Sequence, residues 1–275
     1  MSTVAEALRT ATQRLAATSD TARLDAELLM AHALGVTRSD LLLRHMRDPA
    51  PGSFAQLVDR RAGHEPVAYI IGHAEFYGLD LLVTPAVLIP RGDSETVVDA
   101  ALALSPAPKR LLDLGTGSGA LLLAVLAHLP DAWGVALDRS AEALGVAMSN
   151  AARLGLATRV SSVEADWRRP GWQDGLGTFD LILCNPPYVE EDAPLAPDVR
   201  EWEPAGALFA GPDGLDDYRV LITQLSTLLN PRGVAVFEIG HRQADAVTAL
   251  AQAHGFTAEL RRDLAGRPRA LVLTR

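Results

Sequence analysis

The sequence predicts an α/β fold: a mostly parallel sheet covered by helices on both faces, preceded by a small helical bundle and a short β linker. Three observations lead to this prediction. From residue 109 onward, apolar β-prone runs alternate with helical segments, which is typical of parallel strands joined by crossover helices. Residues 1 to about 70 show helical spacing without strand alternation. Residues 67–90, between these two parts, are rich in β-prone side chains.

In the N-terminal part, apolar residues recur at the spacing of a helix. Leu24, Leu28, Ala31 and Leu34 mark one face of an expected helix, and Gly35 follows it as a typical helix stop. Further apolar residues continue the pattern after a break at residues 49–52, which contains two prolines and a glycine. We therefore expect a small bundle of short helices.

The β-prone segment begins at residues 69–71, and Gly72 and Gly78 punctuate it, so we expect one or two short strands that form a hairpin. Beyond it, a helix is expected over residues 95–104, with Asp93 or Ser94 as its cap. The expected domains are residues 1–70 for the helical part, 71–90 for the β-hairpin linker and 91–275 for the α/β part.

The α/β part is predicted in detail from its alternating pattern. The expected strands are residues 110–114, 133–137, 160–163, 179–184, 234–239, 256–260 and 270–274. The expected helices are residues 119–129, 141–154, 215–229 and 243–254. Ligands of such sheets bind outside the carboxyl ends of the strands, so we expect the functional residues in the strand-to-helix loops.

The composition is that of a globular chain and excludes several classes of protein. The 275 residues are 48% apolar and 21% charged, and the single cysteine, Cys184, excludes a disulfide framework. No apolar run reaches the length of a membrane span, and the N-terminus has no signal-peptide core, so we expect a cytoplasmic protein that binds no membrane. We also expect a monomer. The net charge is −9 and residues 1–72 are neutral, so no broad basic surface for nucleic acid is expected. The histidine spacing predicts no metal site.

The first strand-to-helix loop, residues 113–119, is rich in glycine. It reads Asp-Leu-Gly-Thr-Gly-Ser-Gly and lets a ligand approach the backbone without meeting a Cβ atom. The spacing differs from the G-x-G-x-x-G pattern of dinucleotide folds. The loop also opens with Asp113, which would repel a pyrophosphate but could accept a hydrogen bond from an ammonium or a hydroxyl group. A ligand with a cationic amino-acid end therefore suits this loop better than NAD.

The next two loops supply acceptors for an adenosine. Asp138 ends the second strand, where a carboxylate can accept both hydroxyls of a ribose; the alternative is a helix cap, a role that Ser140 could fill itself. Asp166 could accept from an adenine amino group, and the Trp167 ring could pack on the base. Together the three loops describe an adenosine that carries an amino acid, which is S-adenosylmethionine.

The fourth loop, Asn185-Pro186-Pro187-Tyr188, follows a buried strand. Two consecutive prolines make a rigid corner without amide hydrogens, so its carbonyl groups have no local donors. The Asn185 side chain and the Pro186 carbonyl could together accept both hydrogens of a planar amino group and direct its lone pair at a sulfonium methyl group. Tyr188 adds a flat face. A strong base is not needed, because the proton becomes acidic once the nitrogen is alkylated.

With these loops, the chain resembles the Rossmann-like methyltransferases that use S-adenosylmethionine, and among them the release factor glutamine methyltransferases. The resemblance covers nearly the whole chain. The family usually has Pro and Thr where this chain has Gly92 and Ser94; Ser94 keeps the hydroxyl and Gly92 loosens the turn. The motifs that carry it are residues 66–72, Glu75-Phe76-Tyr77-Gly78, Leu88-Ile89-Pro90-Arg91, Val199-Arg200, Glu203-Pro204 and residues 211–215.

The resemblance implies N5-methylation of the glutamine in the Gly-Gly-Gln motif of class 1 peptide chain release factors, with residues 1–70 recognising that substrate. It implies that Arg91 and Glu95 frame the mouth of the site, although an interdomain salt bridge is an equal alternative. The implied cofactor-binding residues are Gly115, Thr116, Gly117, Ser118, Gly119, Asp138, Asp166, Trp167 and Asn185. The implied substrate-binding residues are Asn185, Pro186, Pro187 and Tyr188, and the catalytic residues among them are Asn185, Pro186 and Tyr188.

Other functions remain open at this point. A methyltransferase of a ribosomal-protein glutamine would use the same corner, as would an N6-adenine DNA or RNA methyltransferase, which would have to flip out its target base. A protein that binds the cofactor without catalysis is the third alternative. Glu238 and the acidic run at residues 190–192 are expected to be a structural acceptor and a solvated loop.

Overall fold

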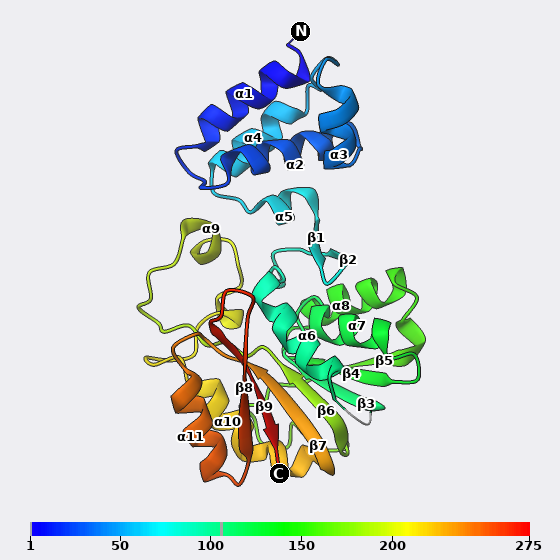
Figure 1. Cartoon of the computed structure of the whole chain (residues 1–275), viewed down its shortest axis with the longest axis vertical. Coiled ribbons are helices and arrows are strands. Elements are labelled where there is room, and N and C mark those ends of the chain that lie inside the picture. The colour runs from blue at the N-terminus through cyan, green and yellow to red at the C-terminus, as the bar shows by residue number, and fades with distance from the viewer. Residues whose placement is uncertain (1, 105–106) are drawn as a thin grey trace. The chain divides into compact units, whose positions relative to one another are not determined.

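The computed structural model describes residues 2–104 and 107–275. The chain divides into two compact units (Figure 1). The smaller helical unit comprises residues 1–73 together with residues 195–202, and the larger unit comprises residues 74–194 and 203–275. The helical unit is thus discontinuous in sequence, because a segment that follows the Asn185 loop belongs to it.

The helical unit is built around apolar faces, but the predicted face of its second helix is wrong: Leu24 is exposed, whereas Leu29 and Met30 are buried. Thr3 and Glu6 form a capping box at the start of its first helix, and Gly35 ends the second helix in the left-handed conformation. Leu15, Leu29 and Met30 are fully buried between these helices. The helices of this unit are α1 (Val4–Leu15), α2 (Ala22–Leu34), α3 (Arg38–Asp40), the π-helix η1 (Leu41–His45), α4 (Phe54–Ala62), α5 (Val67–Ile71) and α9 (Pro197–Arg200).

A buried ion pair ties α4 to α2. The Arg61 Nε atom donates to Asp25 Oδ2 at 2.7 Å, and both side chains are buried. The Arg61 Nη2 atom also lies 3.5 Å from Asp198 Oδ2 of α9. A single guanidinium group therefore links the segment 195–202 to the helices of its unit.

The expectation of strand from residue 69 is wrong, because Tyr69, Ile70 and Ile71 lie in the short helix α5. The helix follows Pro66 and stops at Gly72, which has a left-handed φ of 81°. It buries Tyr69 and Ile70, so tertiary packing outweighs their β propensity. The expected hairpin is present directly afterwards, as β1 (His73–Phe76) and β2 (Leu79–Leu82).

The larger unit confirms the predicted mostly parallel sheet. Its strand order is β5-β4-β3-β6-β7-β9-β8, and β9 runs antiparallel to both of its neighbours, β7 and β8 (Figure 1). The strands are β3 (Arg110–Leu114), β4 (Trp133–Asp138), β5 (Val160–Glu164), β6 (Phe179–Cys184), β7 (Leu229–Glu238), β8 (Thr257–Arg262) and β9 (Pro268–Thr274). The helices are η2 (Gly92–Ser94), α6 (Glu95–Leu102), α7 (Ala120–His128), α8 (Ala141–Arg153), η3 (Ala157–Arg159), η4 (Ala205–Ala207), α10 (Asp216–Leu228) and α11 (Ala244–Ala253).

Both faces of this sheet are covered, as expected for a doubly wound fold. Helices α6, α7 and α8 pack on one face, and α10 and α11 pack on the other (Figure 1). Successive residues of β3 alternate between the two cores: Leu111 contributes to the first, and Leu112 and Leu114 to the second. The central strands are therefore apolar on both sides.

The expected cap of α6 is wrong. Residues 92–94 form the 3-10 turn η2, and the side chain of Ser94 makes no capping hydrogen bond to the helix. Asp93 instead pairs with Arg269 at 2.6 Å. The side chain of Ser94 is left to serve the site described below.

Gly134 in β4 offers a test of core packing. A Cβ atom at this position would lie 2.5 Å from Cδ1 of Leu122, which is completely buried in α7. Gly134→Ala should therefore lower the free energy of unfolding by about 1–3 kcal/mol, measured by chemical denaturation. Gly145→Ala is the control, since its Cβ would meet no atom within 4 Å and alanine favours helix α8. Equal stability of the two variants would contradict the packing argument.

Candidate active site

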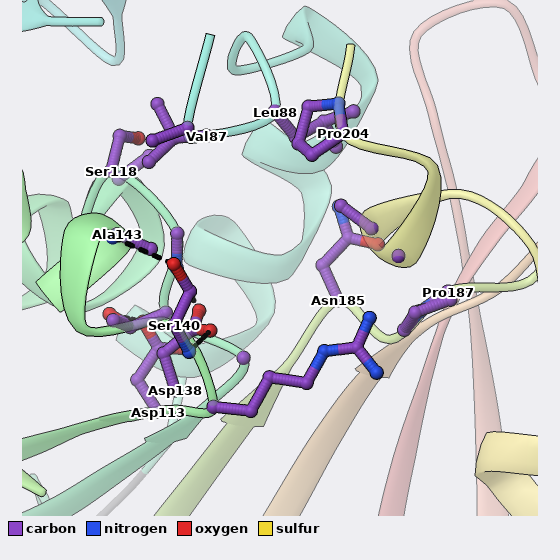
Figure 2. A pocket seen from close by; sticks show the side chains of 18 of the residues that line it. Val87, Leu88, Asp113, Ser118, Asp138, Ser140, Ala143, Asn185, Pro187 and Pro204 are labelled. Atoms are coloured by element: carbon purple, nitrogen blue, oxygen red, sulfur yellow. Dashed lines mark hydrogen bonds between the residues drawn. The ribbon is translucent and has the colours of Figure 1, made fainter. Parts of the chain in front are cut away.

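The parallel register of the central strands brings three loops together. Leu114 at the end of β3 pairs with Leu137 of β4 on one side and with Cys184 of β6 on the other. The loops that follow these strands therefore leave the sheet at one level. A cavity of about 350 Å³ opens there, within the larger unit, and Asn185 and Pro187 face it across from Asp113 and Asp138 (Figure 2).

The glycine loop forms one wall of the cavity. Gly115, Thr116, Gly117 and Ser118 all line it. The backbone nitrogens of Gly115 and Thr116 both donate to the carbonyl of Leu137, which holds the loop over the end of β4. Gly115 and Gly117 have positive φ angles of 74° and 54°, so the turn itself requires glycine at these two positions.

Gly119, the last glycine of this loop, does not line the cavity. It precedes α7 in a left-handed conformation, and a Cβ atom there would lie 2.9 Å from Leu123 Cδ1. This glycine therefore lets α7 pack closely and supports the loop from behind.

Two carboxyl groups lie next to the loop. Asp113 is buried and accepts a hydrogen bond from the Thr116 hydroxyl at 2.7 Å. Burial is the main cause that raises the pKa of Asp113 to about 7; the nearby charge of Asp138 adds to it, and the Thr116 hydrogen bond opposes it. At neutral pH Asp113 is therefore poised between its acid and its carboxylate form.

Asp138 is organised by two backbone amides. Its Oδ2 atom accepts from Gly117 N and its Oδ1 atom from Ser140 N, each at 3.0 Å. Ser140, rather than Asp138, caps α8 by accepting from Ala143 N at 3.1 Å (Figure 2). Each carboxylate oxygen keeps a free lone pair, so Asp138 can still accept two hydroxyl groups.

The loop after β5 supplies the next wall. Trp167 lines the cavity and packs its ring on Gly115, where a Cβ atom would lie 3.1 Å from Trp167 Cη2. Asp166 also lines the cavity, and its Oδ1 atom accepts from the backbone of Arg168 at 3.0 Å. An aromatic face and a carboxylate are thus brought to the same side, as the sequence predicted.

The Asn185 corner closes the cavity on the β6 side. The Asn185 Nδ2 group donates to the Ser94 hydroxyl at 3.5 Å, which leaves its amide oxygen as an acceptor. Pro187 lines the cavity, whereas Pro186 is buried and is not among the lining residues. Ser94 was not predicted as a site residue, because it lies 91 residues before Asn185 in the chain.

Tyr188 does not line the cavity. Its hydroxyl donates to Oε1 of the buried Glu238 at 3.2 Å, and burial raises the pKa of both groups. The register of β6 with β7 pairs Cys184 with Phe237, so Asn185 and Glu238 follow paired residues. Glu238 is therefore a buried acceptor for Tyr188 next to the Asn185 corner.

The remaining wall includes Arg91, which was expected at the mouth of the site, and residues from the segment 204–207, which were not. Arg91 lines the cavity and forms an ion pair with the buried Glu203 of the same unit, whereas Glu95 accepts from the backbone of Tyr77 at 2.9 Å and does not line it. Pro204, Gly206 and Ala207 line the cavity as well. Their local sequence carries no ligand motif, so only the fold reveals them.

Within residues 2–104 and 107–275, no group of three or more histidine, cysteine, aspartate and glutamate side chains could hold a metal ion. No helix in this part of the chain combines the length and the apolar character that crossing a bilayer requires.

Known proteins resemble this chain along most of its length. Residues 6–72 match the PrmC N-terminal domain, and residues 96–198 match the methyltransferase small domain. A solved methyltransferase from Pyrococcus furiosus covers 81% of this chain and 98% of its own at a TM-score of 0.53; at 17% identity it shows the fold alone.

Curated relatives are closer in sequence. The release factor glutamine methyltransferase of Moorella thermoacetica is 44% identical over 283 residues, which cover 99% of each chain. The protein of the same name from Caulobacter vibrioides is 43% identical over 86% of this chain and 84% of its own. Identity at this level over nearly complete chains, together with the methyltransferase fold, shows that the chain belongs to the release factor glutamine methyltransferase family.

Proposed function

We propose that this protein transfers a methyl group from S-adenosyl-L-methionine to N5 of the glutamine in the Gly-Gly-Gln motif of class 1 peptide chain release factors. The observation that carries the proposal is a single cavity bordered both by the glycine loop and by the Asn185 corner. The relatives named release factor glutamine methyltransferase supply the substrate class. Because release factors act in translation, we place the reaction in the cytoplasm. We also propose that the protein acts as a monomer.

The cavity residues fit S-adenosyl-L-methionine. The free lone pairs of Asp138 can accept the ribose hydroxyls, and Trp167 offers its ring to the adenine next to Asp166. The backbone of the glycine loop, from Gly115 to Ser118, admits the methionine part without steric hindrance. When bound, this cofactor supplies an electrophilic methyl group on a sulfonium sulfur.

The Asn185 corner would hold the glutamine carboxamide. Its hydrogen bond to Ser94 directs Nδ2 away from the substrate, so Oδ1 can accept one amide hydrogen while the Pro186 carbonyl accepts the other. Two acceptors in fixed positions orient the nitrogen lone pair, which is weak as a nucleophile until it is positioned. Tyr188 does not line the cavity, so we propose that it supports the Asn185 corner through its hydrogen bond to Glu238.

We also propose roles for the domains. Residues 91–275 would carry the reaction, residues 71–90 would link it to the helical part, and residues 1–70 would recognise the body of the release factor. The charge distribution supports a protein substrate, because residues 1–72 carry eight arginines and eight acidic residues and the excess of negative charge lies elsewhere.

Removal of the Asn185 carboxamide tests the site. Asn185→Ala should lower kcat for methyl transfer to a release factor at least about a hundredfold, because the amide loses a fixed acceptor. Transfer is measured with labelled cofactor, and circular dichroism shows that the variant is folded. Label uptake that persists when the Gly-Gly-Gln glutamine is replaced by alanine would contradict the proposed substrate, and uptake by DNA or RNA would favour an adenine methyltransferase.

Asp113 predicts a pH dependence of cofactor binding. We place the cationic ammonium group of the cofactor near Asp113, whose pKa of about 7 means that binding must release a proton below that pH. Affinity should therefore rise as the pH increases from about 6 to about 7.5, with a slope of up to about one logarithmic unit per pH unit. Asp113→Asn, measured by calorimetry, should bind the cofactor more weakly and lose this increase of affinity with pH. The same slope in both proteins would exclude Asp113 as its source.

Recognition by the helical part predicts a difference between substrates. A complete release factor should have a KM at least about tenfold below that of a peptide containing only the Gly-Gly-Gln loop, because it makes additional contacts. Leu43, which is 80% exposed on the helical unit, is a candidate contact. Leu43→Asp should therefore reduce the ratio of the KM for the peptide to the KM for the complete release factor. The control is Leu264→Asp, an equally apolar exposed position outside that unit. An identical KM for the peptide and the complete protein would contradict this role.

A further inference from the structure

Asp217 is a buried carboxylate at the cavity that the proposed chemistry does not use. It lies in the first turn of α10 and lines the cavity, although it is far in sequence from the ligand loops. Its Oδ1 atom accepts from Trp167 Nε1 at 2.7 Å and from Arg168 Nε at 3.0 Å. Its Oδ2 atom accepts from Arg168 Nη2 at 2.8 Å.

These contacts form a closed arrangement. A carboxylate without contact to water is tolerated only when it is paired and its oxygens are satisfied, and Arg168 and Trp167 together provide that. The position of Asp217 near the N-terminus of α10 is also favourable for a negative charge. Asp217, Trp167 and Arg168 therefore form an ordered part of the cavity wall.

The consequence for Trp167 is a fixed ring. An indole has one hydrogen-bond donor, so binding that donor to Asp217 selects one orientation of the ring. In this orientation Cη2 and Cζ3 of Trp167 would lie 3.1 Å and 3.4 Å from a Cβ atom on Gly115. The ring is thus held between the glycine loop at one edge and Asp217 at the other.

We propose that Asp217 is a positioning residue that holds Trp167 in place as the adenine-binding wall. This inference rests on the proposed function, because the wall recognises adenine only if the methyl donor is an adenosyl compound. A ring that is ordered before binding loses no further side-chain entropy when the ligand binds, so the effect of Asp217 is on affinity for the adenosyl part. The methyl-transfer step itself does not involve Asp217.

The first test compares two ligands that differ only in the base. Asp217→Asn should raise the Kd of S-adenosylhomocysteine about tenfold, because the side chain loses its charge-assisted hydrogen bonds. The Kd of S-ribosylhomocysteine, which lacks adenine, should stay unchanged. In methyl transfer, KM for the cofactor should rise while kcat stays within about twofold. A role confined to folding would weaken both ligands equally and would overturn the proposal.

Asp216→Asn is the matched control. Asp216 is the neighbouring residue in α10, pairs with the half-exposed Arg219 at 3.0 Å and does not line the cavity. Its substitution removes an acidic charge from the same helix turn and should change neither Kd. A tenfold effect of this control would show that the charge of the helix N-terminus, and not the contact with Trp167, governs binding.

The second test is a double-mutant cycle with Trp167→Phe, which keeps an aromatic ring but removes Nε1–H. If Asp217 acts through the indole, the effect of Asp217→Asn on S-adenosylhomocysteine binding should fall below about threefold in the Trp167→Phe background. An equal effect in both backgrounds would overturn the proposal.

If Asp217→Asn does not fold, Asp217→Glu replaces it, since it keeps a negative charge for Arg168 but moves the acceptor of Trp167 Nε1. It should weaken binding of S-adenosylhomocysteine several-fold and leave S-ribosylhomocysteine unaffected; unchanged binding of both contradicts the proposal. Binding to the wild-type protein distinguishes failure of the proposed function from failure of the role proposed for Asp217. If it binds no S-adenosylhomocysteine, the proposed function itself fails, whereas wild-type binding with unaltered variants removes only the role of Asp217.

Discussion

The site depends on one constraint, the uninterrupted parallel pairing of β3 with β4 and β6. Leu114 has a paired residue on each side, Leu137 and Cys184, so the three strands stop together. Because parallel strands share a direction, everything that follows them is delivered to one edge. The glycine loop, Asp138 and Asn185 are up to 72 residues apart in sequence, and the shared edge of the sheet brings them to one cavity.

That edge must also accommodate negative charge in an apolar setting, and it does so in three ways. Asp217 is paired with Arg168 and stays within a closed hydrogen-bond cluster. The hydrogen bond from Thr116 offsets only part of the effect of burial on Asp113, so the pKa of Asp113 rises. Glu238 accepts from Tyr188, and burial raises its pKa as well. A cationic ligand suits such a place, since it adds the positive charge that the protein provides only in part.

Local sequence was sufficient for the parts of the site whose chemistry resides in consecutive residues. The glycine loop and the Asn185 corner carry backbone constraints, and those constraints are visible as glycine and proline. Ser94, Glu203 and Asp217 could not be found in this way, because each contributes an ordinary polar side chain whose role arises from a partner distant in sequence.

The predicted helices and strands show the same contrast between local sequence signals and contacts between distant residues. The central strands β3, β4 and β6 were predicted to within one residue, since apolar runs on both faces leave few alternatives. The strand predicted at residues 234–239 is longer than expected, because β7 begins at Leu229. The helix α5 was missed because Tyr69 and Ile70 favour strands intrinsically, and only their burial in the helical unit decides for helix. Propensity therefore failed where packing between separate segments determines the conformation.

The discontinuity of the helical unit affects how its gene can be divided. Residues 195–202 belong to that unit, and Asp198 contacts the same Arg61 that pairs with Asp25, so the chain passes between the units three times. A single recombination event near residue 73 would separate α9 from the helices it accompanies. Exchange of the helical part between homologous genes therefore requires two coordinated segments, and this favours the inheritance of both units as one piece.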